Sequence, residues 1–488
     1  MVKRPDERSP LLQNGDANGG YEDDESFEIV EFSKEDEDNP RNWTRRRKMM
    51  NVGIIALMAI LSPLASSMFT PGIGEIAKCL DTTADVVVGA TTGFVVCLGI
   101  GPLVLAPLSE TFGRRKLYLY CFSTFTILQI PTALSPNVAC LIAVRTVSGF
   151  FGSVGIANGG GTVSDMFHPS QRAGVFGWYL LGPLLGPTLG PLFGGLIVQY
   201  LGWRWVFWIL TIVCAINTII GFFYLKESYA PVILEARKHS YEQSYPDTIY
   251  RLKDQDDRPF KTKLAHSMIR PLRILFTQPI VLTMAIYQAI LFGTIYSLYT
   301  NFAAIWGDGY GFNTTQVGLM YLGTGVGLLS AVWFIVPRID TVYNALAHKL
   351  NNGEAKPEYR LPLANIGAVL VPASLFWFAW TVQYHVHWTV PLLSTVFFGL
   401  GQVTILNTVQ NYYIDSFSKY AASAIAAGAV FRSIVGGIVP LGAPALFERA
   451  GYGWGISVFG FLAVALSPAP LLFFRYGEGI RKMFAIEM

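Results

Sequence analysis

Long apolar segments, each separated from the next by a short polar stretch, recur along the 488-residue chain. A helix crosses a hydrocarbon core of about 30 Å with roughly 20 apolar residues. The pattern therefore predicts twelve membrane spans, at 49–69, 86–106, 117–135, 139–161, 174–200, 203–224, 280–304, 316–338, 361–382, 388–414, 421–446 and 452–474. Because backbone polar groups in lipid must be satisfied within their own segment, the spans are helices and the predicted fold is an all-α polytopic membrane protein.

Polar segments divide these spans into two groups of six. The predicted organisation is a disordered acidic cytoplasmic tail, a six-helix bundle, a cytoplasmic linker loop, a second six-helix bundle and a cytoplasmic C-terminal tail, at 1–44, 45–225, 226–279, 280–475 and 476–488. A weak internal repeat supports the division, because Asp165-Met-Phe follows the fourth span and Asp415-Ser-Phe follows the tenth, 250 residues later. Parallel repeats of this kind enclose a substrate cavity between them.

The composition agrees with a membrane protein. Hydrophobic residues make up 52% of the chain and charged residues only 14%, whereas soluble chains carry about 25% charged residues. No HExxH, GxSxG or P-loop motif is found, so the chain is not expected to be an enzyme. The five cysteines form no CxxC pair, and neither a metal site nor a cofactor is expected. Nothing suggests a nucleic-acid partner.

The positive charges predict the orientation. Short loops rich in Lys and Arg stay cytoplasmic, and most of the 36 Lys and Arg residues fall on the side that holds both termini. The opposite side holds Lys78, Arg204 and Arg449. Both termini are therefore expected in the cytoplasm. The cell membrane is the expected location, with the vacuolar membrane as the alternative, because Glu7 followed by Leu11-Leu12 has the spacing of an acidic dileucine sorting signal.

Three motifs in the first six spans resemble those of a known family. They are Ala106-Pro-Leu-Ser-Glu-Thr-Phe-Gly-Arg-Arg-Lys116, Leu141-Ile-Ala-Val-Arg-Thr-Val-Ser-Gly149 and Gly186-Pro-Thr-Leu-Gly-Pro-Leu-Phe-Gly-Gly195. In that order they resemble the loop motif, the intramembrane arginine motif and the antiporter motif of the major facilitator superfamily. Ala106 stands where the loop motif usually begins with Gly, and Glu110 stands where it usually has Asp.

Four further segments are similar to the fungal twelve-span drug:proton antiporter branch of that superfamily. They are Asn39-Pro-Arg-Asn-Trp43, Gly202-Trp-Arg-Trp-Val-Phe207, Glu227-Ser-Tyr-Ala-Pro231 and Pro357-Glu-Tyr-Arg-Leu-Pro362. The likeness covers the chain from about residue 39 onward. It implies two pseudo-symmetric six-helix bundles in a monomer, with protons and a small organic molecule as the transported partners.

The loop motif predicts a conformational latch on the cytoplasmic side. An acid, a turn-forming glycine and two cations meet at a helix junction, and an acid at the inner end of the fourth span is placed to join them. The predicted latch residues are Glu110, Gly113, Arg114, Arg115 and Asp165. Ion pairs that break and re-form provide a two-state element for a transport cycle. The alternative is that the cations only anchor the topology.

Arg145 is a permanent cation in an apolar span, where charge is costly and must face a partner or a polar interior. The resemblance implies that it influences protonation of a nearby acid, as a proton-coupling or cavity cation. The alternative is a structural arginine that hydrogen-bonds backbone carbonyls. The acids all fall near predicted span ends, so the proton acceptor is not identified. Arg432 in the eleventh span is equally compatible with a structural pairing and a substrate role.

Small residues and prolines alternate along the fifth span. Glycines at every fourth position let helices approach closely, and prolines bend the axis. The resemblance implies that this helix seals an antiporter against proton leak, while the alternative is helix packing alone. The residues assigned to this antiporter helix are Gly186, Pro187, Gly190, Pro191, Gly194 and Gly195.

The family's cavity lies mainly between spans 1, 4, 7 and 10. Those spans offer uncharged polar candidates for substrate contact, which are Ser66, Asn158, Gln288, Tyr296, Asn301, Gln402, Asn407 and Gln410. A mainly apolar cavity with such groups suits a lipophilic organic molecule. Each candidate has the alternative role of an interhelical hydrogen bond. In addition, Asn313-Thr-Thr315 is a predicted glycosylation acceptor in an outside loop.

These features predict a secondary active transporter that exports drugs or fungal secondary metabolites such as toxins, coupled to protons. The alternative is a polyamine or nutrient transporter of the same superfamily. Cationic polyamines favour carboxylates in a cavity, and the sequence offers none near the centre of a span.

Overall fold

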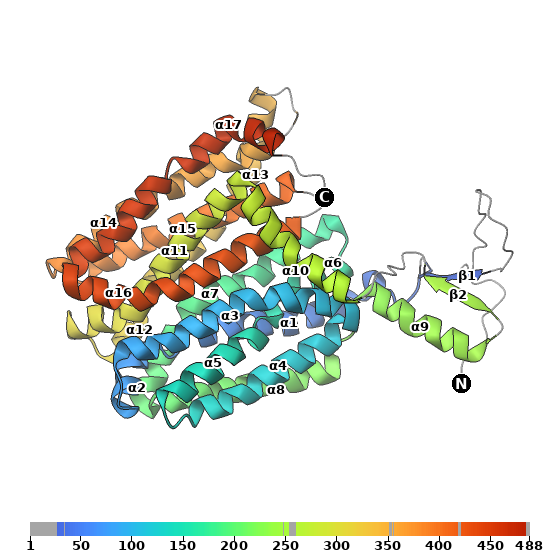
Figure 1. Ribbon diagram of the computed structural model, residues 1–488, viewed down its shortest axis with the longest axis horizontal. Coiled ribbons are helices and arrows are strands. Elements are labelled where there is room, and N and C mark those ends of the chain that lie inside the picture. The colour runs from blue at the N-terminus through green and yellow to red at the C-terminus, as the bar shows by residue number, and fades with distance from the viewer. Residues whose placement is uncertain are drawn as a thin grey trace.

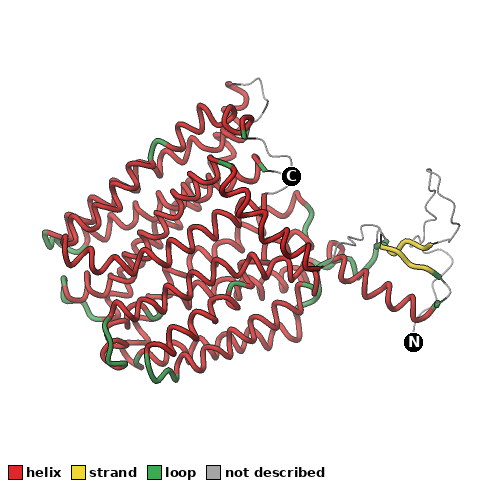
Figure 2. Tube along the Cα trace, viewed as in Figure 1, coloured by secondary structure: helices red, strands yellow, loops and turns green. Residues whose placement is uncertain are grey.

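A computed structural model describes residues 27–33, 35–246, 248–252, 260–350, 354, 356–417 and 421–484. Within these ranges the chain is almost wholly helical, with the two strands confined to an arm beside the bundle (Figure 2). The tail before residue 27, with its dileucine spacing at Glu7 and Leu11-Leu12, lies outside the described residues.

The N-terminal half of the bundle contains eight α-helices and a short 3₁₀ turn, η2 (Thr70–Gly72). The helices are α1 (Arg45–Ser67), α2 (Ile73–Cys79), α3 (Ala84–Phe112), α4 (Arg114–Ala133), α5 (Val138–Gly152), α6 (Val154–Met166), α7 (Pro169–Leu201) and α8 (Trp203–Tyr224). Positive φ angles at Gly113 (95°) and Gly202 (87°) allow the sharp turns between α3 and α4 and between α7 and α8.

The C-terminal half follows the same plan. Its elements are α11 (Pro279–Phe302), η3 (Ala303–Asp308), α12 (Thr314–Ser330), η4 (Ala331–Ile335), α13 (Val336–Leu350), η5 (Pro357–Leu363), α14 (Ala364–Gln383), α15 (Thr389–Ser416), α16 (Ala421–Leu466) and α17 (Ala469–Met483). A non-helical φ of 71° at Gly451 breaks α16 into two spans, as Gly202 separates the last two helices of the first half.

All twelve predicted spans coincide with helices. Ten helical segments of the described chain are long and apolar enough to cross a membrane, and one of these, Ser423–Met483, contains the break at Gly451 and so provides two spans. The remaining span is α4, a 20-residue helix that is not among the ten but fills the place of the predicted third span. The prediction of an all-α polytopic fold is confirmed.

The arm beside the bundle joins part of the N-terminal tail to the central loop (Figure 1). Strand β1 (Phe27–Val30) pairs in parallel with β2 (Ile249–Leu252), next to helix α9 (Ala230–Ser244). Helix α10 (Phe260–Thr277) then leads back to the bundle. The predicted linker loop therefore contains two helices and one strand, and the pairing of the two strands was not predicted.

One arginine holds the tail against the loop. Arg237 of α9 forms ion pairs with Asp36 at 2.6 Å and with Asp38 at 2.8 Å. Burial would raise the pKa of the Asp36 carboxyl, but the hydrogen bonds and positive charge of Arg237 outweigh burial and lower that pKa. The expectation of disorder up to residue 44 is therefore wrong for the described part from residue 27, because strand pairing and ion pairs with the loop order it.

The two ends of the bundle are distinguished by the helix termini and turns found at each. The inner end is where α1 begins and α6 ends, and the outer end holds α2, Gly202 and Gly451. Among the described residues, five side-chain hydrogen bonds are seen to join the two halves, and these five lie toward the outer end. They are Ser66–Tyr296 (3.4 Å), Thr70–Tyr321 (3.3 Å), Thr188–Tyr299 (3.2 Å), Thr92–Gly437 (2.7 Å) and Thr315–Gln199 (3.2 Å).

The glycine stripe of α7 permits close backbone contact with α1. A Cβ added at Gly194 would lie 1.7 Å from the carbonyl oxygen of Met68, and one at Gly190 would lie 2.6 Å from that of Leu64. Gly195 faces the other half, where an added Cβ would lie 2.6 Å from the carbonyl oxygen of Thr314 in α12. One helix thus packs closely against its own half and against the opposite half.

Replacement of Gly194 by Ala should destabilise the protein, because the new methyl group would overlap the Met68 carbonyl and force α7 away from α1. Overpacking of this kind costs about 1–3 kcal/mol. The melting midpoint of the purified protein in detergent measures the effect. Gly53→Ala is the matched control, because nothing lies within 4 Å of a Cβ there. Equal midpoints for the two variants would show that the close contact is unimportant.

Candidate functional site

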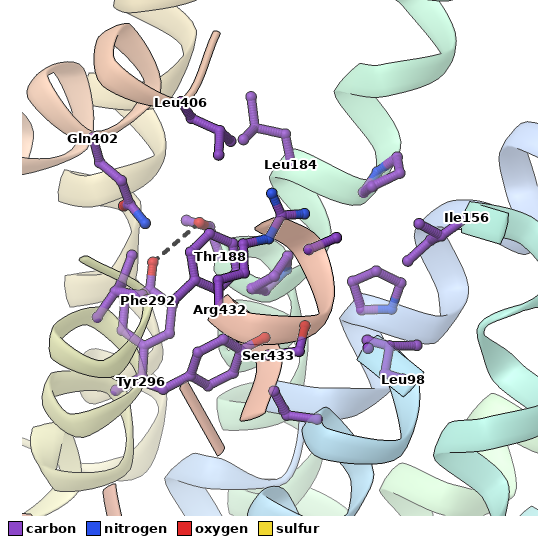
Figure 3. Close-up of a pocket in the computed structure, with 18 of the residues that line it drawn as sticks. Leu98, Ile156, Leu184, Thr188, Phe292, Tyr296, Gln402, Leu406, Arg432 and Ser433 are labelled. Atoms are coloured by element: carbon purple, nitrogen blue, oxygen red, sulfur yellow. Dashed lines mark hydrogen bonds between the residues drawn. The ribbon is translucent and has the colours of Figure 1, made fainter. Parts of the chain in front are cut away.

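A cavity of about 140 Å³ lies between the two halves of the bundle (Figure 3). The N-terminal half lines it from α1, α3, α6 and α7, and the C-terminal half lines it from α11, α12, α15 and α16. On α7 the Pro183 and Pro187 side of the helix faces the cavity, whereas the glycine stripe faces α1. The two stripes of this helix therefore have different functions, one in packing and one in shaping the cavity.

Most of the cavity wall is apolar. Its polar groups are Thr188, Tyr296, Tyr299, Gln402, Arg432 and Ser433. The hydroxyl groups of Thr188 and Tyr299 are 3.2 Å apart and bond to each other, while the carbonyl oxygen of Gln402 has no hydrogen-bond partner among the described residues. No Asp or Glu belongs to the described lining. The cavity is therefore suited to an organic molecule with few hydrogen-bonding groups.

Arg432 of α16 places a positive charge in this cavity. Its guanidinium carbon lies 4.8 Å from the centre of the Phe292 ring, which supports the cation from α11. Figure 3 shows the guanidinium group pointing into the space between Leu184, Leu406 and Gln402. Its Nε atom is buried and has no hydrogen-bond partner within the described chain. The cation is thus held by an aromatic ring rather than by a carboxylate.

Arg145 occupies a different environment, outside the described cavity lining. It is fully buried, and its Nη2 donates to the carbonyl oxygens of Ala65 at 3.0 Å and Ser66 at 3.5 Å, at the end of α1. The rings of Phe69 and Phe94 lie 4.6 and 4.4 Å from its guanidinium carbon. Arg145 thus links α5 to α1 through backbone carbonyls, which is the structural arrangement that the sequence left open.

The predicted latch residues do come together at the inner end. Arg114 is almost fully buried, and its Nε lies 3.2 Å from a carboxylate oxygen of Asp165. Glu110 is more distant, 3.8 Å from Arg114 Nη2, and its side chain is half exposed. The Arg115 guanidinium donates to the backbone carbonyls of Leu225 and Phe222, at 2.7 and 3.0 Å. All of these contacts fall within the N-terminal half and its linker.

Glu227 completes this cluster, although the sequence assigned it no role. Its carboxylate accepts hydrogen bonds from the backbone N–H groups of Arg114 at 2.9 Å and Arg115 at 3.0 Å. These N–H groups open α4 and have no partner within the helix, so an acidic cap is favourable there. The positive φ of Gly113 brings them toward Glu227, and a Cβ at Gly113 would lie 2.6 Å from that carboxylate.

The C-terminal half repeats the main ion pair. Arg360, at the start of the ninth span, lies 2.7 Å from Asp415 at the end of the tenth, just as Arg114 and Asp165 pair at the third and fourth spans. Arg360 also pairs with Asp340 and lies over the ring of Tyr343. The internal repeat around Asp165 and Asp415 therefore corresponds to two equivalent ion pairs at the inner end.

A sequence profile described as Major Facilitator Superfamily matches residues 55–440, which is well over half of the chain. The chain belongs to the Major Facilitator Superfamily. The resemblance inferred from the motifs is thereby confirmed. The chain is a multi-pass membrane protein and a secondary transporter of a small-molecule substrate, and it is not an enzyme.

Fungal relatives of the superfamily match most of the chain. The MFS-type transporter tndD of Aspergillus flavipes is 39% identical over 92% of this chain and 84% of its own length. The efflux pump radE of Floropilus chiversii is 38% identical, over 94% and 86%. Among solved structures, a D-xylose-proton symporter shares the fold with a TM-score of 0.65 and 13% identity, over 87% of this chain and 97% of that one.

The predicted cavity residues of this superfamily member divide into two groups. Tyr296 and Gln402 line the cavity, and Ser66 bonds to Tyr296 at its edge. The others are outside the described lining. Two of them bond within their own helix, whereas Asn158 and Gln288 have buried side-chain nitrogens without a hydrogen-bond partner among the described residues. These remaining residues are Asn158, Gln288, Asn301, Asn407 and Gln410, of which Asn301 and Asn407 donate to the carbonyls of Ser297 and Val403.

Sequence reasoning missed the cavity residues of helices outside the four expected spans. Thr188 and the prolines of α7 face the cavity, and α3 and α16 contribute Gly99 and Ser433, which lie close together. Gly99 lies at a close crossing of α3 and α16, because an added Cβ there would lie 2.1 Å from the Ser433 side chain. A glycine opposite a serine marks a close helix crossing, but the sequence alone does not indicate which helices cross.

Replacement of Arg114 by Ala should destabilise the inner end of the N-terminal half, since it leaves Asp165 and Ser109 without their main partner. Loss of hydrogen bonds to a charged group costs about 2 kcal/mol. The expected result is a lower melting midpoint and faster proteolysis near the start of α4. Lys116→Ala, at an exposed site two residues away, is the control and should leave both unchanged. If the two variants behaved alike, the ion pair would contribute little.

Proposed function

We propose that this transporter exports small lipophilic organic compounds, such as drugs or secondary metabolites, in exchange for protons. The observation that carries the proposal is the apolar cavity between the two halves, whose described lining contains one arginine and no carboxylate. The fungal relative radE, described as an efflux pump, supports export over uptake. Because relatives of this kind match the chain along most of its length, the proposal concerns the whole chain rather than one segment.

The cavity chemistry argues against the alternative of a polyamine transporter. A polyamine carries several positive charges, and its removal from water requires nearby anionic groups. The described lining presents instead the positive charge of Arg432, which would repel such a substrate. A sugar or other nutrient with many hydroxyl groups would need more hydrogen-bonding partners than Thr188, Tyr296, Tyr299, Gln402 and Ser433 provide.

The latch and α7 have proposed functions in the transport cycle. We assign the Glu110–Arg114–Asp165 cluster to a change of state at the inner end, since Arg114 has two carboxylates within reach, the largely buried Asp165 and the half-exposed Glu110, and can exchange between them. The close packing of α7 on α1 and α12 supports its assignment as a barrier to proton leak. The role of Arg145 in proton coupling stays a prediction, as do the monomeric state and the cytoplasmic position of both termini.

Glycosylation of Asn313 also stays a prediction. Asn313 is exposed and caps α12, where its side-chain oxygen accepts a hydrogen bond from the N–H of Gln316 at 2.9 Å. Attachment of a glycan uses the side-chain nitrogen, so the cap and a glycan are compatible. The cell membrane is the proposed location, with the vacuolar membrane as the alternative.

Export coupled to protons can be tested with the purified protein in proteoliposomes. A panel of radiolabelled lipophilic compounds should move against the direction of an imposed proton gradient, and the flux should fall when an ionophore collapses that gradient. Liposomes without protein provide the background. Flux that is saturable but indifferent to the gradient would contradict proton coupling, and absence of saturable flux for the whole panel would contradict export of lipophilic compounds.

Replacement of Arg145 by Ala should lower transport while the protein still inserts into the membrane. The variant loses the hydrogen bonds to the Ala65 and Ser66 carbonyls, so α1 and α5 lose a rigid connection beside the cavity. Gradient-driven flux per inserted molecule is the measurement. Unchanged flux would contradict a role for Arg145 in transport. Arg204→Ala is the matched control and should retain full flux, because Arg204 is a half-buried arginine at the outer end, away from the cavity.

A further inference from the structure

Arg432 is the charged residue of the described cavity lining, and it has no anionic partner within the described chain. The lining residues that surround it are uncharged. Phe292 and Tyr296 lie on the α11 side, Gln402 on the α15 side and Thr188 on the α7 side. The ring of Phe292 compensates part of the charge, since an aromatic face attracts a guanidinium. The guanidinium group that carries the charge points into the cavity.

A permanent cation without a counter-ion is unfavourable in a membrane interior, and the cost falls when an anion binds beside it. The intramembrane arginine of the other half, Arg145, lies in a different environment. Arg145 is sealed away from solvent and bonds to two backbone carbonyls, whereas Arg432 remains partly exposed toward the cavity. Arg145 is thus enclosed by the fold, although its Nε and Nη1 have no hydrogen-bond partner among the described residues, whereas Arg432 is open to a ligand in the cavity.

The planar guanidinium group has a preferred type of ligand. It presents N–H donors in a fork that matches the two oxygens of a carboxylate or of a similar delocalised anion. The neighbouring Leu184, Leu406 and Phe292 provide apolar contact for the rest of a molecule. The Gln402 side-chain carbonyl, which has no partner among the described residues, adds an acceptor for one further polar group.

We propose that Arg432 is a specificity residue that selects organic acids, so that the transported compounds are lipophilic molecules bearing one carboxylate or equally delocalised anion. The anion pairs with the Arg432 guanidinium, and the apolar body of the compound lies against Leu184, Leu406 and Phe292. This inference rests on the proposed function, to which it adds the chemical class of the substrate.

The experiment compares matched acids and amides on the protein in lipid nanodiscs and in proteoliposomes. The probes are three aromatic carboxylates, 1-naphthylacetate, indole-3-acetate and 4-phenylbutyrate, each paired with its neutral primary amide. Equilibrium binding to nanodiscs and saturable flux into proteoliposomes are measured for every probe. The wild-type protein should bind at least one acid about tenfold or more tightly than its amide. Arg432→Gln should reduce that ratio to about one, while Arg432→Lys should retain part of it.

Controls separate a local effect from misfolding. Arg204→Gln removes an arginine at the outer end that contacts Trp203 and Cys79, and it should keep the full acid-to-amide ratio. Melting midpoints identify any variant that has lost its fold. If Arg432→Gln does not fold, Phe292→Leu, which removes the ring beneath the guanidinium, should still weaken acid binding more than amide binding.

The outcomes distinguish this inference from the proposed function. Acid-selective binding without gradient-driven flux would support the role of Arg432 and contradict proton-coupled export. Flux of the amides equal to that of the acids would support export and overturn the inference. Binding of no acid by the wild-type protein, or an acid preference that persists in Arg432→Gln, would also overturn it, because the preference would then have no source in this residue.

Discussion

In a membrane, a polar group that is not bonded to the protein has no water to bond to, and this constraint shapes every level of the structure. The backbone satisfies it by forming helices. Threonines within the spans satisfy it by donating to a carbonyl one turn back, as Thr126 and Thr404 do. Arg145 satisfies it only in part, because its Nη2 bonds to two carbonyls of α1 and two aromatic rings lie against its guanidinium, while its Nε and Nη1 have no hydrogen-bond partner among the described residues. Arg432, whose Nε also has no partner among the described residues, differs because it lies where the two halves leave a cavity.

The two halves repeat one design with small differences. Each has an arginine–aspartate pair at its inner end, Arg114 with Asp165 and Arg360 with Asp415, and each begins its last span after a glycine of positive φ. The bonds that join the halves lie toward the outer end and are mostly between hydroxyl groups. Such bonds are weak singly, so they are suited to a contact that opens during each cycle.

The fold was largely predictable from the sequence, because span length and hydrophobicity are local properties of the chain. The proximity of Glu110 and Arg114 was also predictable, since they are near in sequence and a family motif includes them. The cavity lining was only partly predictable. Tyr296 and Gln402 were identified, but Thr188 and Ser433 were not, because the side of a helix that faces a cavity depends on how distant helices pack. The ordering of the tail by Arg237 depends on a contact across about 200 residues, which no local pattern reveals.

The central claim is that the halves separate and rejoin around the cavity. The most direct test is the distance between spin labels at the outer end, on cysteines introduced at the exposed positions Lys78 and Arg449 after replacement of the five native cysteines. Double electron–electron resonance in lipid nanodiscs should give two populations, a short distance for the joined outer end and a longer one for the separated state, with proportions that change with pH. A single narrow distance at every pH would contradict the account.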